Sequence, residues 1–408
     1  MERKNFCYVP FRELYFEHTS GDTKPGYRSC CIQKQSHKGE LFNKSDNWFQ
    51  NDSELVRIRK EFLEDKRPAN CSNCWAEEDN NLVSSRLHEN KKYVNQYRHV
   101  LPEDPPVLEI IDVRLTNKCN LQCKMCYSGN SDQIAKNIIA ATKAGAIGQT
   151  QQSKEYWDGQ QADFYKDLGN IDPINGLFEF IMANDSIREI KFAGGESFLM
   201  PEIEELMLNL IDAGRTNLYI YFLTNCTTVK TSVLEILKKF DRCEVGYSID
   251  GPDKWIEYQR FPVKWNTLKR NYRKLREHNM ETSITPCWSQ LNMLGLADFL
   301  KWVKEETVTN NVSYNEVRTP SYLQWELIPL QYRTELIDEL DSMDLRSLDL
   351  DLDLDFDYFT ISQRLKQNVR EINERERIEL HNNVNLWDFN NPVKYRDMYP
   401  WASELLGE

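Results

Sequence analysis

Short apolar segments alternate with amphipathic helical segments over the middle of the chain, and this alternation constrains the fold more than any other feature. Four of the apolar segments span residues 189–194, 218–225, 243–250 and 282–288, and turn-forming residues follow each of them. Helical sequences over 203–214, 232–240 and 267–279 separate them. Strands and helices that alternate at this spacing predict parallel strands in an α/β sheet or barrel. In such folds the chemistry collects at the carboxyl ends of the strands.

The same pattern starts further upstream, at Val107. Ile111 and Val113 alternate with Asp112 and Arg114, and this period of two predicts a strand. The predicted parts of the chain are a small irregular cysteine-containing domain (1–95), a proline-bearing linker (96–106), a core (107–330) with a polar insert at about 127–173, and a C-terminal extension (331–408). Inside the first part, Leu55, Ile58 and Phe62 share one face at helical spacing and predict an amphipathic helix.

Composition narrows the class of protein. The chain has 408 residues, of which 40% are apolar, and this is enough for one large core and a smaller one. Its formal net charge of -13 disfavours generic nucleic-acid binding, because an acidic chain repels phosphate backbones. The first residues show no signal peptide, and no segment has the apolar length of a membrane span. We therefore expect a cytoplasmic protein that does not enter a membrane.

Eleven cysteines in such a chain are unsuited to a disulfide framework, because the cytosol keeps thiols reduced. Eight of them fall into two groups, which suggests two metal centres. The first group is Cys7, Cys30, Cys31, Cys71 and Cys74, and the second is Cys119, Cys123 and Cys126. The remaining Cys226, Cys243 and Cys287 lie among apolar residues, and small core side chains are the default interpretation for them.

The second group stops at three cysteines, in the spacing C-x3-C-x2-C directly after the strand at 107–115. A cluster held by three thiolates keeps one iron without a protein ligand, and that iron can bind a small molecule. A zinc knuckle or three buried thiols is the alternative for Cys119, Cys123 and Cys126. The strand–loop context favours the open cluster.

These residues resemble the radical S-adenosylmethionine (SAM) enzymes. The resemblance implies that Cys119, Cys123 and Cys126 bind a 4Fe-4S cluster whose open iron chelates the amino and carboxylate groups of SAM. In that family the reduced cluster cleaves SAM to a 5′-deoxyadenosyl radical, which takes a hydrogen atom from the substrate. Known members use a partial (β/α)6 barrel related to the TIM barrel, and the family's motifs extend here over residues 107–330.

Further motifs support the resemblance. Gly194, Gly195 and Glu196 look like the family's GGE motif, which meets the SAM amino group. Two glycines let the backbone approach a ligand, and a carboxylate suits an ammonium. The stretch SIDGPDKWIEYQR looks like the fifth-strand segment of the SPASM and twitch branches. The resemblance implies that Ser248 touches SAM and that Arg260 pairs with its carboxylate, for which a guanidinium is suited; a solvated helix charge is the alternative for Arg260.

Four more positions follow from the same resemblance. Asp250 supports the loop, and Asn225 belongs to the TN pair that ends the fourth strand. Cys226 replaces the glycine that commonly comes next. Asn292 follows the sixth strand as a further SAM-contacting candidate. Met125 holds the position before the third cysteine, where a side chain near the adenine is usual.

The first cysteine group resembles a twitch domain, the shortened form of SPASM, placed before the barrel. That resemblance implies an auxiliary 4Fe-4S cluster held by Cys7, Cys71, Cys74 and either Cys30 or Cys31. A zinc site is the alternative, since CxxC with two more thiols also satisfies zinc. The run DLDLDLDFD at 349–357 predicts an edge strand with a leucine face and an aspartate face. Calcium binding there is disfavoured, because no glycine turns the run into a loop.

The sequence as a whole predicts a radical SAM enzyme with an N-terminal auxiliary-cluster domain. Its expected partners are an electron donor such as flavodoxin or ferredoxin and a substrate. A peptide or protein side chain is the expected substrate, and a small molecule or a nucleotide stays open. A non-catalytic iron–sulfur scaffold or redox sensor is the alternative of a different class.

Overall fold

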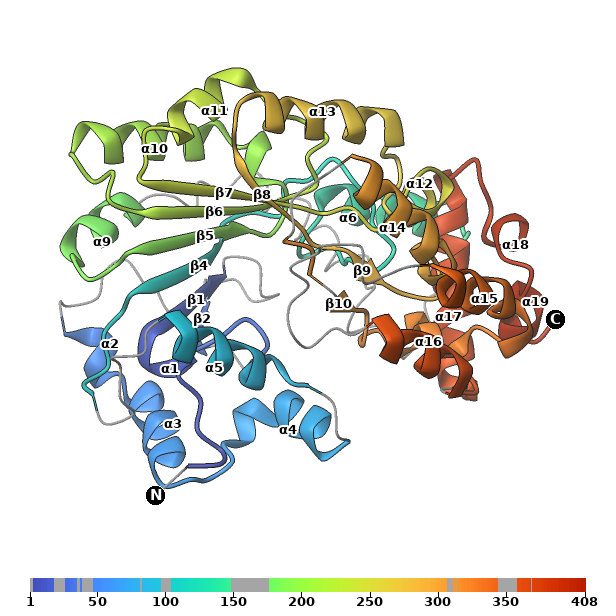
Figure 1. Ribbon diagram of the computed structural model, residues 1–408, viewed down its shortest axis with the longest axis horizontal. Helices are drawn as coiled ribbons and strands as arrows, with labels where there is room; N and C mark the ends of the chain where they lie inside the picture. The colour runs from blue at the N-terminus through green and yellow to red at the C-terminus, as the bar shows by residue number, and fades with distance from the viewer. Residues whose placement is uncertain are drawn as a thin grey trace. The chain divides into compact units, whose positions relative to one another are not determined.

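The computed structural model describes residues 3–17, 26–34, 37–38, 47–80, 83–96, 104–147, 176–306, 311–313, 315–343, 358–367 and 369–408. These residues form two compact units, whose elements are labelled in Figure 1. Unit 1 comprises Met1–Thr116, Asp172–Phe222 and Glu235–Cys243. Unit 2 comprises Asn117–Ile171, Leu223–Leu234 and Glu244–Glu408. The predicted Asp/Leu strand at 349–357 and most of the predicted insert lie outside the described residues.

Unit 1 is built on a mostly parallel sheet. Its strands, in the order β3-β2-β1-β4-β5-β6, are β3 (His37–Lys38), β2 (Gly26–Arg28), β1 (Glu13–Glu17), β4 (Ile110–Arg114), β5 (Glu189–Ala193) and β6 (Tyr219–Thr224), the last of which continues into unit 2. β2 is antiparallel to both β1 and β3, whereas β1 pairs parallel with β4, β4 with β5 and β5 with β6. The register places Tyr15 level with Asp112, and Asp112 level with Lys191. The N-terminal segment therefore contributes strands to the same sheet as the first core strands.

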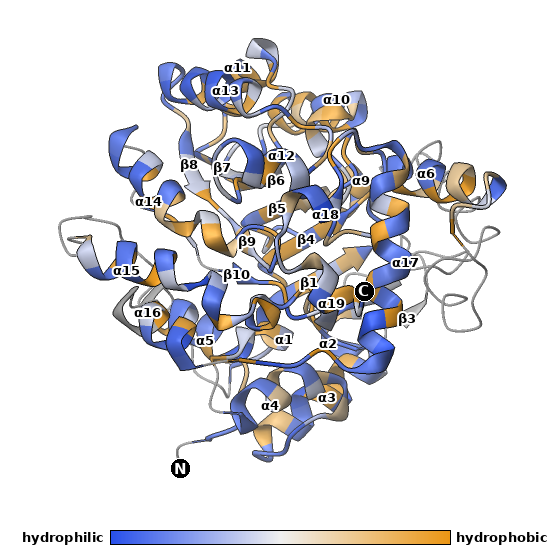
Figure 2. Ribbon diagram, turned by 90° about the vertical axis from the view of Figure 1, so that its right-hand side faces the viewer, coloured by the Kyte–Doolittle hydropathy of each residue, from blue (hydrophilic) through white to orange (hydrophobic). Residues whose placement is uncertain are grey.

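Amphipathic helices accompany this sheet. They are α1 (Val9–Arg12), α2 (Trp48–Asn51), α3 (Ser53–Leu63), α4 (Ser72–Asp79), α5 (Ser85–Gln96), α9 (Leu177–Ala183), α10 (Pro201–Asp212) and α11 (Thr231–Leu237), with short 3-10 turns at Ala69–Cys71 and Ser197–Leu199. Leu55, Ile58 and Phe62 of α3 are fully buried, which confirms the predicted amphipathic helix. Helix α10 carries both hydrophilic and hydrophobic colours in Figure 2, as expected of a helix that buries one face.

Unit 2 contains β7 (Arg242–Tyr247), which starts at the boundary of unit 1, and β8 (Glu281–Ile284), which pairs parallel with it. A second small sheet pairs β9 (Cys287–Trp288) with β10 (Asn315–Glu316). The helices are α6 (Asp132–Lys143), α12 (Lys254–Gln259), α13 (Trp265–Glu277), α14 (Leu296–Glu305), α15 (Thr334–Ser342), α16 (Tyr358–Gln367), α17 (Glu374–Asn390), α18 (Tyr395–Met398) and α19 (Ala402–Leu406). Short 3-10 turns lie at Met293–Gly295, Ser321–Leu323, Trp325–Leu327 and Leu330–Tyr332.

The structure confirms the α/β class with mostly parallel strands, and it contains no closed barrel among the described residues. The strands predicted at 189–194, 218–225 and 243–250 correspond to β5, β6 and β7. The segment predicted at 282–288 divides into β8 and β9. Within the described part of the chain, none of the helices combines the length and the apolar character that crossing a bilayer requires.

Candidate cofactor and metal site

The three-cysteine loop of unit 2 is held firmly at its backbone. The amide of Cys119 donates to Asp132 Oδ1 at 3.0 Å, at the first turn of α6. The amide of Cys126 donates to the carbonyl of Cys123 at 3.0 Å, which closes a tight turn between these two cysteines. Asn225 directs its amide at the sulfur of Cys119 at 3.9 Å. The fold therefore places Asn225, a candidate predicted from the TN pair, beside the sulfur of Cys119.

The middle of the loop is pinned to the segment after α12. The amides of Gln122 and Lys124 donate to the carbonyls of Phe261 and Gln259, at 2.6 and 2.8 Å. Burial raises the pKa of Cys126 to about 12 and also raises that of Cys123. Burial thus favours the neutral thiols, and a metal centre has to displace their protons when it binds.

Asp250 and Arg260 form the charged centre of unit 2. Arg260 Nε and Nη2 donate to the two carboxylate oxygens of Asp250, at 2.5 and 2.8 Å. Gln259 Nε2 and the backbone amide of Cys287 also donate to this carboxylate, at 2.6 and 2.9 Å. The Asp250 side chain is fully buried and that of Arg260 is 11% exposed. Arg260 is thus no solvated helix charge, and Asp250 holds it as the sequence predicted of a loop-supporting residue.

Asn292 braces the same centre. Its amide donates to the carbonyls of Asp250 and Cys287, at 2.9 and 3.0 Å. Its oxygen accepts from the amide of Ser289 at 2.7 Å. Ser248 is buried, and its backbone amide donates to the carbonyl of Thr224 at 3.0 Å. These contacts give Asn292 a bracing role in the loops that carry Asp250.

Two residues of this region were missed by sequence reasoning. Cys287, taken as a core side chain, is half-buried and has Cys123 and Arg260 as electrostatic neighbours. Lys124, inside the cysteine loop, is buried with its ammonium 5.3 to 5.9 Å from the ring centres of Tyr258, Phe261 and Trp387. Burial lowers the pKa of Lys124 to about 7. Its neighbour Met125 is half-buried.

The predicted GGE motif lies in unit 1, directly after β5. Gly194 and Gly195 both adopt left-handed backbone, with φ of 76° and 55°. A Cβ atom on Gly194 would stand 3.0 Å from Cδ of Arg114, so this position excludes a side chain for two reasons. Glu196 is buried, and its Oε1 accepts from the amide of Phe198 at 3.1 Å.

The N-terminal cysteines of unit 1 separate into two environments. Cys7, Cys30 and Cys71 all pack against one hydrophobic cluster, and Cys7 has Cys71 and Cys74 as electrostatic neighbours. Cys30 likewise has Cys7 and Cys71 as neighbours. Cys31 is exposed and interacts with the charged residues of β4. Burial raises the pKa of Cys71 to about 12. Cys30 therefore neighbours Cys31 as well as Cys7 and Cys71, and Cys31 in addition neighbours the charged residues of β4.

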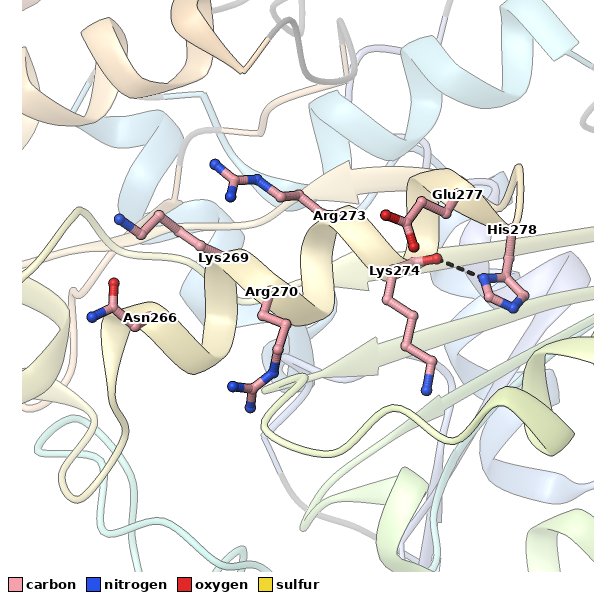
Figure 3. Close-up of a pocket in the computed structure, with 7 residues that line it drawn as sticks. All are labelled: Asn266, Lys269, Arg270, Arg273, Lys274, Glu277 and His278. Atoms are coloured by element: carbon pink, nitrogen blue, oxygen red, sulfur yellow. Dashed lines mark hydrogen bonds between the residues drawn. The ribbon is translucent and has the colours of Figure 1, made fainter.

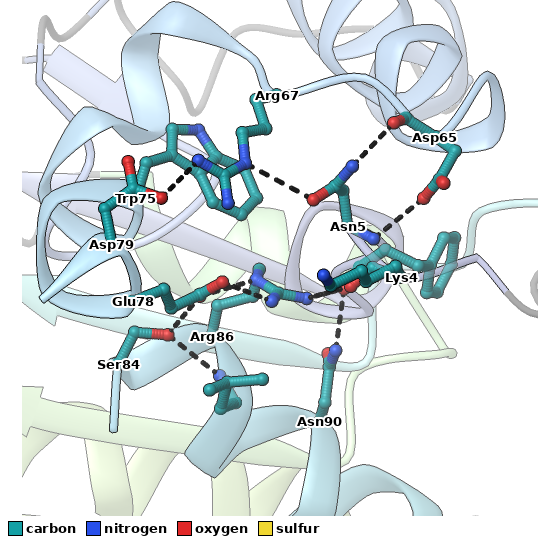
Figure 4. Close-up of polar contacts among 12 residues, drawn as sticks. Lys4, Asn5, Asp65, Arg67, Trp75, Glu78, Asp79, Ser84, Arg86 and Asn90 are labelled. Carbon is teal, nitrogen blue, oxygen red and sulfur yellow. Dashed lines mark hydrogen bonds and ion pairs between the residues drawn. The ribbon is translucent and has the colours of Figure 1, made fainter. Parts of the chain in front are cut away.

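A buried arginine connects the segments that carry these thiols (Figure 4). Arg86 donates to both oxygens of Glu78, at 2.9 and 2.6 Å, and to the carbonyl of Phe6 at 2.6 Å. Its guanidinium also lies 5.0 Å from the ring centre of Trp75. Because Phe6 precedes Cys7 and Trp75 follows Cys74, this network fixes both cysteines.

In the described residues, no three His, Cys, Asp or Glu side chains converge on a single ion position. The thiolates of an iron–sulfur cube bind different irons, so its ligands need not converge on one point. The loop of Cys119, Cys123 and Cys126 offers three thiols from one short segment, which fits such a cube.

A pocket along α13 is lined by none of the predicted site residues (Figure 3). It is lined by Asn266, Lys269, Arg270, Arg273, Lys274, Glu277 and His278. Arg273 pairs with Glu306 at 2.6 Å, and His278 Nδ1 lies 2.9 Å from the carbonyl of Lys274. Most of its lining side chains are basic, and it shares no residue with the cysteine loop.

Comparisons with known proteins concern the core of the chain. Residues 113–303 match the family model described as Radical SAM superfamily, which confirms for this segment the resemblance inferred from the cysteine motif. The chain is 25% identical over 197 residues to the uncharacterized protein MJ0907 of Methanocaldococcus jannaschii. That match covers 47% of this chain and 57% of the relative, so it spans little more than half of the relative's length.

Two solved structures are also similar. Native anSMEcpe with bound AdoMet and Cp18Cys peptide is 17% identical, with a TM-score of 0.41, and the match covers 60% of this chain and 63% of that chain. Streptococcus suis SuiB bound to precursor peptide SuiA is 15% identical, with a TM-score of 0.36, and the match covers 78% and 66%.

Proposed function

We propose that this chain is a radical SAM enzyme whose catalytic cluster is held by Cys119, Cys123 and Cys126. The observation that carries the proposal is the three-thiol loop itself, which lies inside the matched segment 113–303 and is pinned by hydrogen bonds on both sides. When bound, the 4Fe-4S cluster with SAM supplies the reductive cleavage that generates a 5′-deoxyadenosyl radical.

The residues around the loop bind and orient SAM in this proposal. A guanidinium has five N–H donors, and Asp250 takes up two of those of Arg260. Arg260 also hydrogen-bonds to Cys123 and Cys287, which places it beside a proposed cluster ligand. The SAM carboxylate pairs with this guanidinium in the proposal, while Asp250 fixes its plane. Asn225 and Ser248 provide polar contacts, and Asn292 acts as a positioning residue through Asp250. Met125 borders the adenine.

The GGE motif meets the amino group of SAM in the same proposal. Gly194 and Gly195 both have left-handed φ values, which residues with a Cβ atom rarely adopt. Glu196 supplies the carboxylate for the ammonium.

An auxiliary 4Fe-4S cluster in a twitch-like N-terminal domain is the second part of the proposal. Its ligands in the proposal are Cys7, Cys30, Cys71 and Cys74. Cys7 has Cys71 and Cys74 as electrostatic neighbours and Cys30 has Cys7 and Cys71, whereas Cys31, also a neighbour of Cys30, interacts with the charged residues of β4. Zinc is the competing occupant of this set. A cytoplasmic electron donor of the flavodoxin or ferredoxin type completes the system.

The test is reductive cleavage of SAM. Anaerobically reconstituted protein, given SAM and dithionite, is expected to form 5′-deoxyadenosine, which is quantified by chromatography. Replacing Cys119, Cys123 and Cys126 together by Ala should abolish the product. Cys243→Ala is the matched control, since this half-buried cysteine belongs to neither group. Undiminished cleavage by the triple variant would refute the assignment and leave the scaffold or redox-sensor alternative.

Iron content tests the second cluster independently. Two four-iron cubes give about eight irons per chain, and replacing Cys71 and Cys74 together by Ser should lower this to about four. About four irons and one zinc in the unaltered protein would instead identify a zinc module in unit 1.

A further inference from the structure

Strands β1, β4 and β5 are neighbours in the sheet of unit 1 (Figure 1). Their register divides their residues between an apolar face and a second face that carries most of their charged residues. The register puts Leu14, Phe16, Ile111, Val113, Ile190 and Phe192 on the apolar face, all at most 1% exposed. The same register puts Glu13, Tyr15, Glu17, Asp112, Arg114, Glu189 and Lys191 on the other face, together with the apolar Ile110 and Ala193. We call this second set the charged face.

Burial makes this charged face costly. Glu13, Glu17, Asp112 and Glu189 are between 4% and 6% exposed. Taking a charge out of water costs several kcal/mol, and replacing buried ion pairs by apolar residues is often neutral or stabilising. Parallel strands buried on both sides are therefore ordinarily apolar on both sides. Stability alone does not account for charges here, so a ligand is the better explanation.

Carboxylates outnumber the cations that pair with them on the charged face. Lys191 pairs with Glu13 at 3.1 Å and Arg114 with Asp112 at 3.2 Å. Arg28 of β2 pairs with Glu17 at 2.5 Å. Glu189 adds a further carboxylate 4.0 Å from Lys191, and Glu89 of α5 acts electrostatically on Glu13. Among the described residues, these five carboxyl groups thus face three cations, and four carboxylates remain when Glu13 holds its proton. The excess of negative charge favours a ligand that brings a positive charge.

Two orphaned polar atoms indicate where that ligand binds. Among the described residues, the buried atoms Asp112 Oδ1 and Arg114 Nε have no hydrogen-bond partner. A buried acceptor without a partner destabilises the protein, more so when it is charged. Asp112 Oδ1 calls for a donor and Arg114 Nε for an acceptor, two residues apart on one strand face. An α-amino group beside its own carbonyl offers both.

Tyr15 keeps the surrounding cations in place. Its ring centre lies 4.6 Å from the guanidinium carbon of Arg28 and 5.5 Å from that of Arg114. Its hydroxyl donates to Glu17 at 2.9 Å. The orientation of Arg114 is thereby set before a ligand arrives, which lowers the cost of binding.

The charged face is partly exposed at Arg114 and Lys191 and adjoins the GGE motif. The side chains of Arg114 and Lys191 keep 20% and 17% of their exposure, and the exposed Cys31 interacts with both. Gly194 packs against Arg114, because a Cβ atom at this position would lie only 3.0 Å from Cδ of Arg114. A ligand on Asp112 and Arg114 therefore lies beside residues that we assign to SAM binding.

We propose that Asp112 and Arg114 bind the α-amino group and neighbouring carbonyl of the substrate, the chemistry of a peptide's amino-terminal residue or of a free amino acid. This inference rests on the proposed function for its catalytic meaning and names the substrate class of that site. Glu13, Glu17 and Lys191 tune the charge of the site, and Tyr15 orients it.

The test measures binding of small probes, by titration calorimetry, to reconstituted protein without SAM or reductant. Tri-alanine and alanine amide are expected to bind, and N-acetyl-tri-alanine at least tenfold more weakly. Comparing tri-alanine with free alanine distinguishes a peptide from an amino acid as the source of the group. Equal binding of the free and acetylated peptides, or no binding of either, would overturn the proposal, and this comparison needs no variant.

Variants then locate the site. Asp112→Asn keeps the shape of the side chain and should weaken tri-alanine binding at least tenfold, and Arg114→Lys, which removes Nε but keeps the charge, should weaken it too. Asp212→Asn is the matched control, because Asp212 is exposed at the end of α10. Unchanged affinity in folded Asp112→Asn would show that the charged face is only structural. Because the readout needs no SAM cleavage, failure of the proposed function leaves this result interpretable.

Discussion

Replacing Arg260 by Ala should destabilise unit 2 strongly, because it leaves the fully buried carboxylate of Asp250 without its cation. Two of the four hydrogen bonds to Asp250 disappear, those from Nε and Nη2 at 2.5 and 2.8 Å. Breaking a buried ion pair costs about 3–5 kcal/mol, and two charged hydrogen bonds at about 1.5–3 kcal/mol each give a similar range. Gln259 and the Cys287 amide still donate, so we expect a loss of about 3 kcal/mol.

Thermal unfolding and SAM titration measure this effect. A loss of about 3 kcal/mol corresponds to a fall in Tm of roughly 6–12 °C for a domain of 150–250 residues. The double variant Asp250→Asn with Arg260→Ala should recover most of the loss, since the buried charge goes with its partner. Arg273→Ala, which removes an exposed arginine of α13, should change Tm little. SAM affinity should fall in Arg260→Ala. A Tm within about 2 °C of the original would refute the reasoning from burial.

Three further predictions concern other parts of the molecule. Burial raises the pKa of Glu13 from 4.5 to about 7, so the native state holds this proton more tightly and loses stability as the pH rises between these values. The stability of Glu13→Gln, measured by urea unfolding, should therefore rise relative to the unaltered chain from pH 5 to 7. A difference that does not change with pH would contradict this. Cys30→Ser should lower the iron content of unit 1 whereas Cys31→Ser should not, and the reverse result would exchange the two roles. Cys226 has a φ of 50°, so Cys226→Gly should be at least as stable as Cys226→Ala in urea unfolding, and a clearly more stable Ala variant would argue against strain there.

Local patterns predicted the strands well. The period-two alternation around Ile111 and Val113 indicates β4, and the apolar segment at 189–194 indicates β5. Both are detectable because the burial of a strand requires apolar residues close together in the sequence. β1 was missed. All of its residues from Glu13 to Glu17 are buried, so its sequence shows charged residues at positions that lie inside the molecule. A pattern rule that expects polar residues outside cannot find such a strand.

The motif residues of unit 2 were predictable as a set, but their contacts were not. Arg260 follows α12 and was predicted to pair with the SAM carboxylate, with a solvated helix charge as the alternative. The chain folds it against Asp250, ten residues away, a contact that the sequence did not indicate. Gln259 and Cys287 join the same carboxylate from other segments. Their participation depends on the packing of the loops after β7 and β8, which no spacing along the sequence specifies. The nearest sequence signal was Asp250 itself, a lone carboxylate at the end of an apolar strand.

Cys226 shows what a departure from a motif preserves. The resembling family commonly has glycine here, and the cysteine nevertheless keeps a left-handed φ of 50°. Its amide donates to Thr224 Oγ1 at 3.0 Å and its carbonyl accepts from Asn271 at 2.7 Å. Left-handed backbone costs a residue with a Cβ atom about 1–2 kcal/mol, and these hydrogen bonds with complete burial of the thiol offset it. The turn directs Asn225 at Cys119, so the backbone conformation, and not glycine as such, is what the cysteine loop requires.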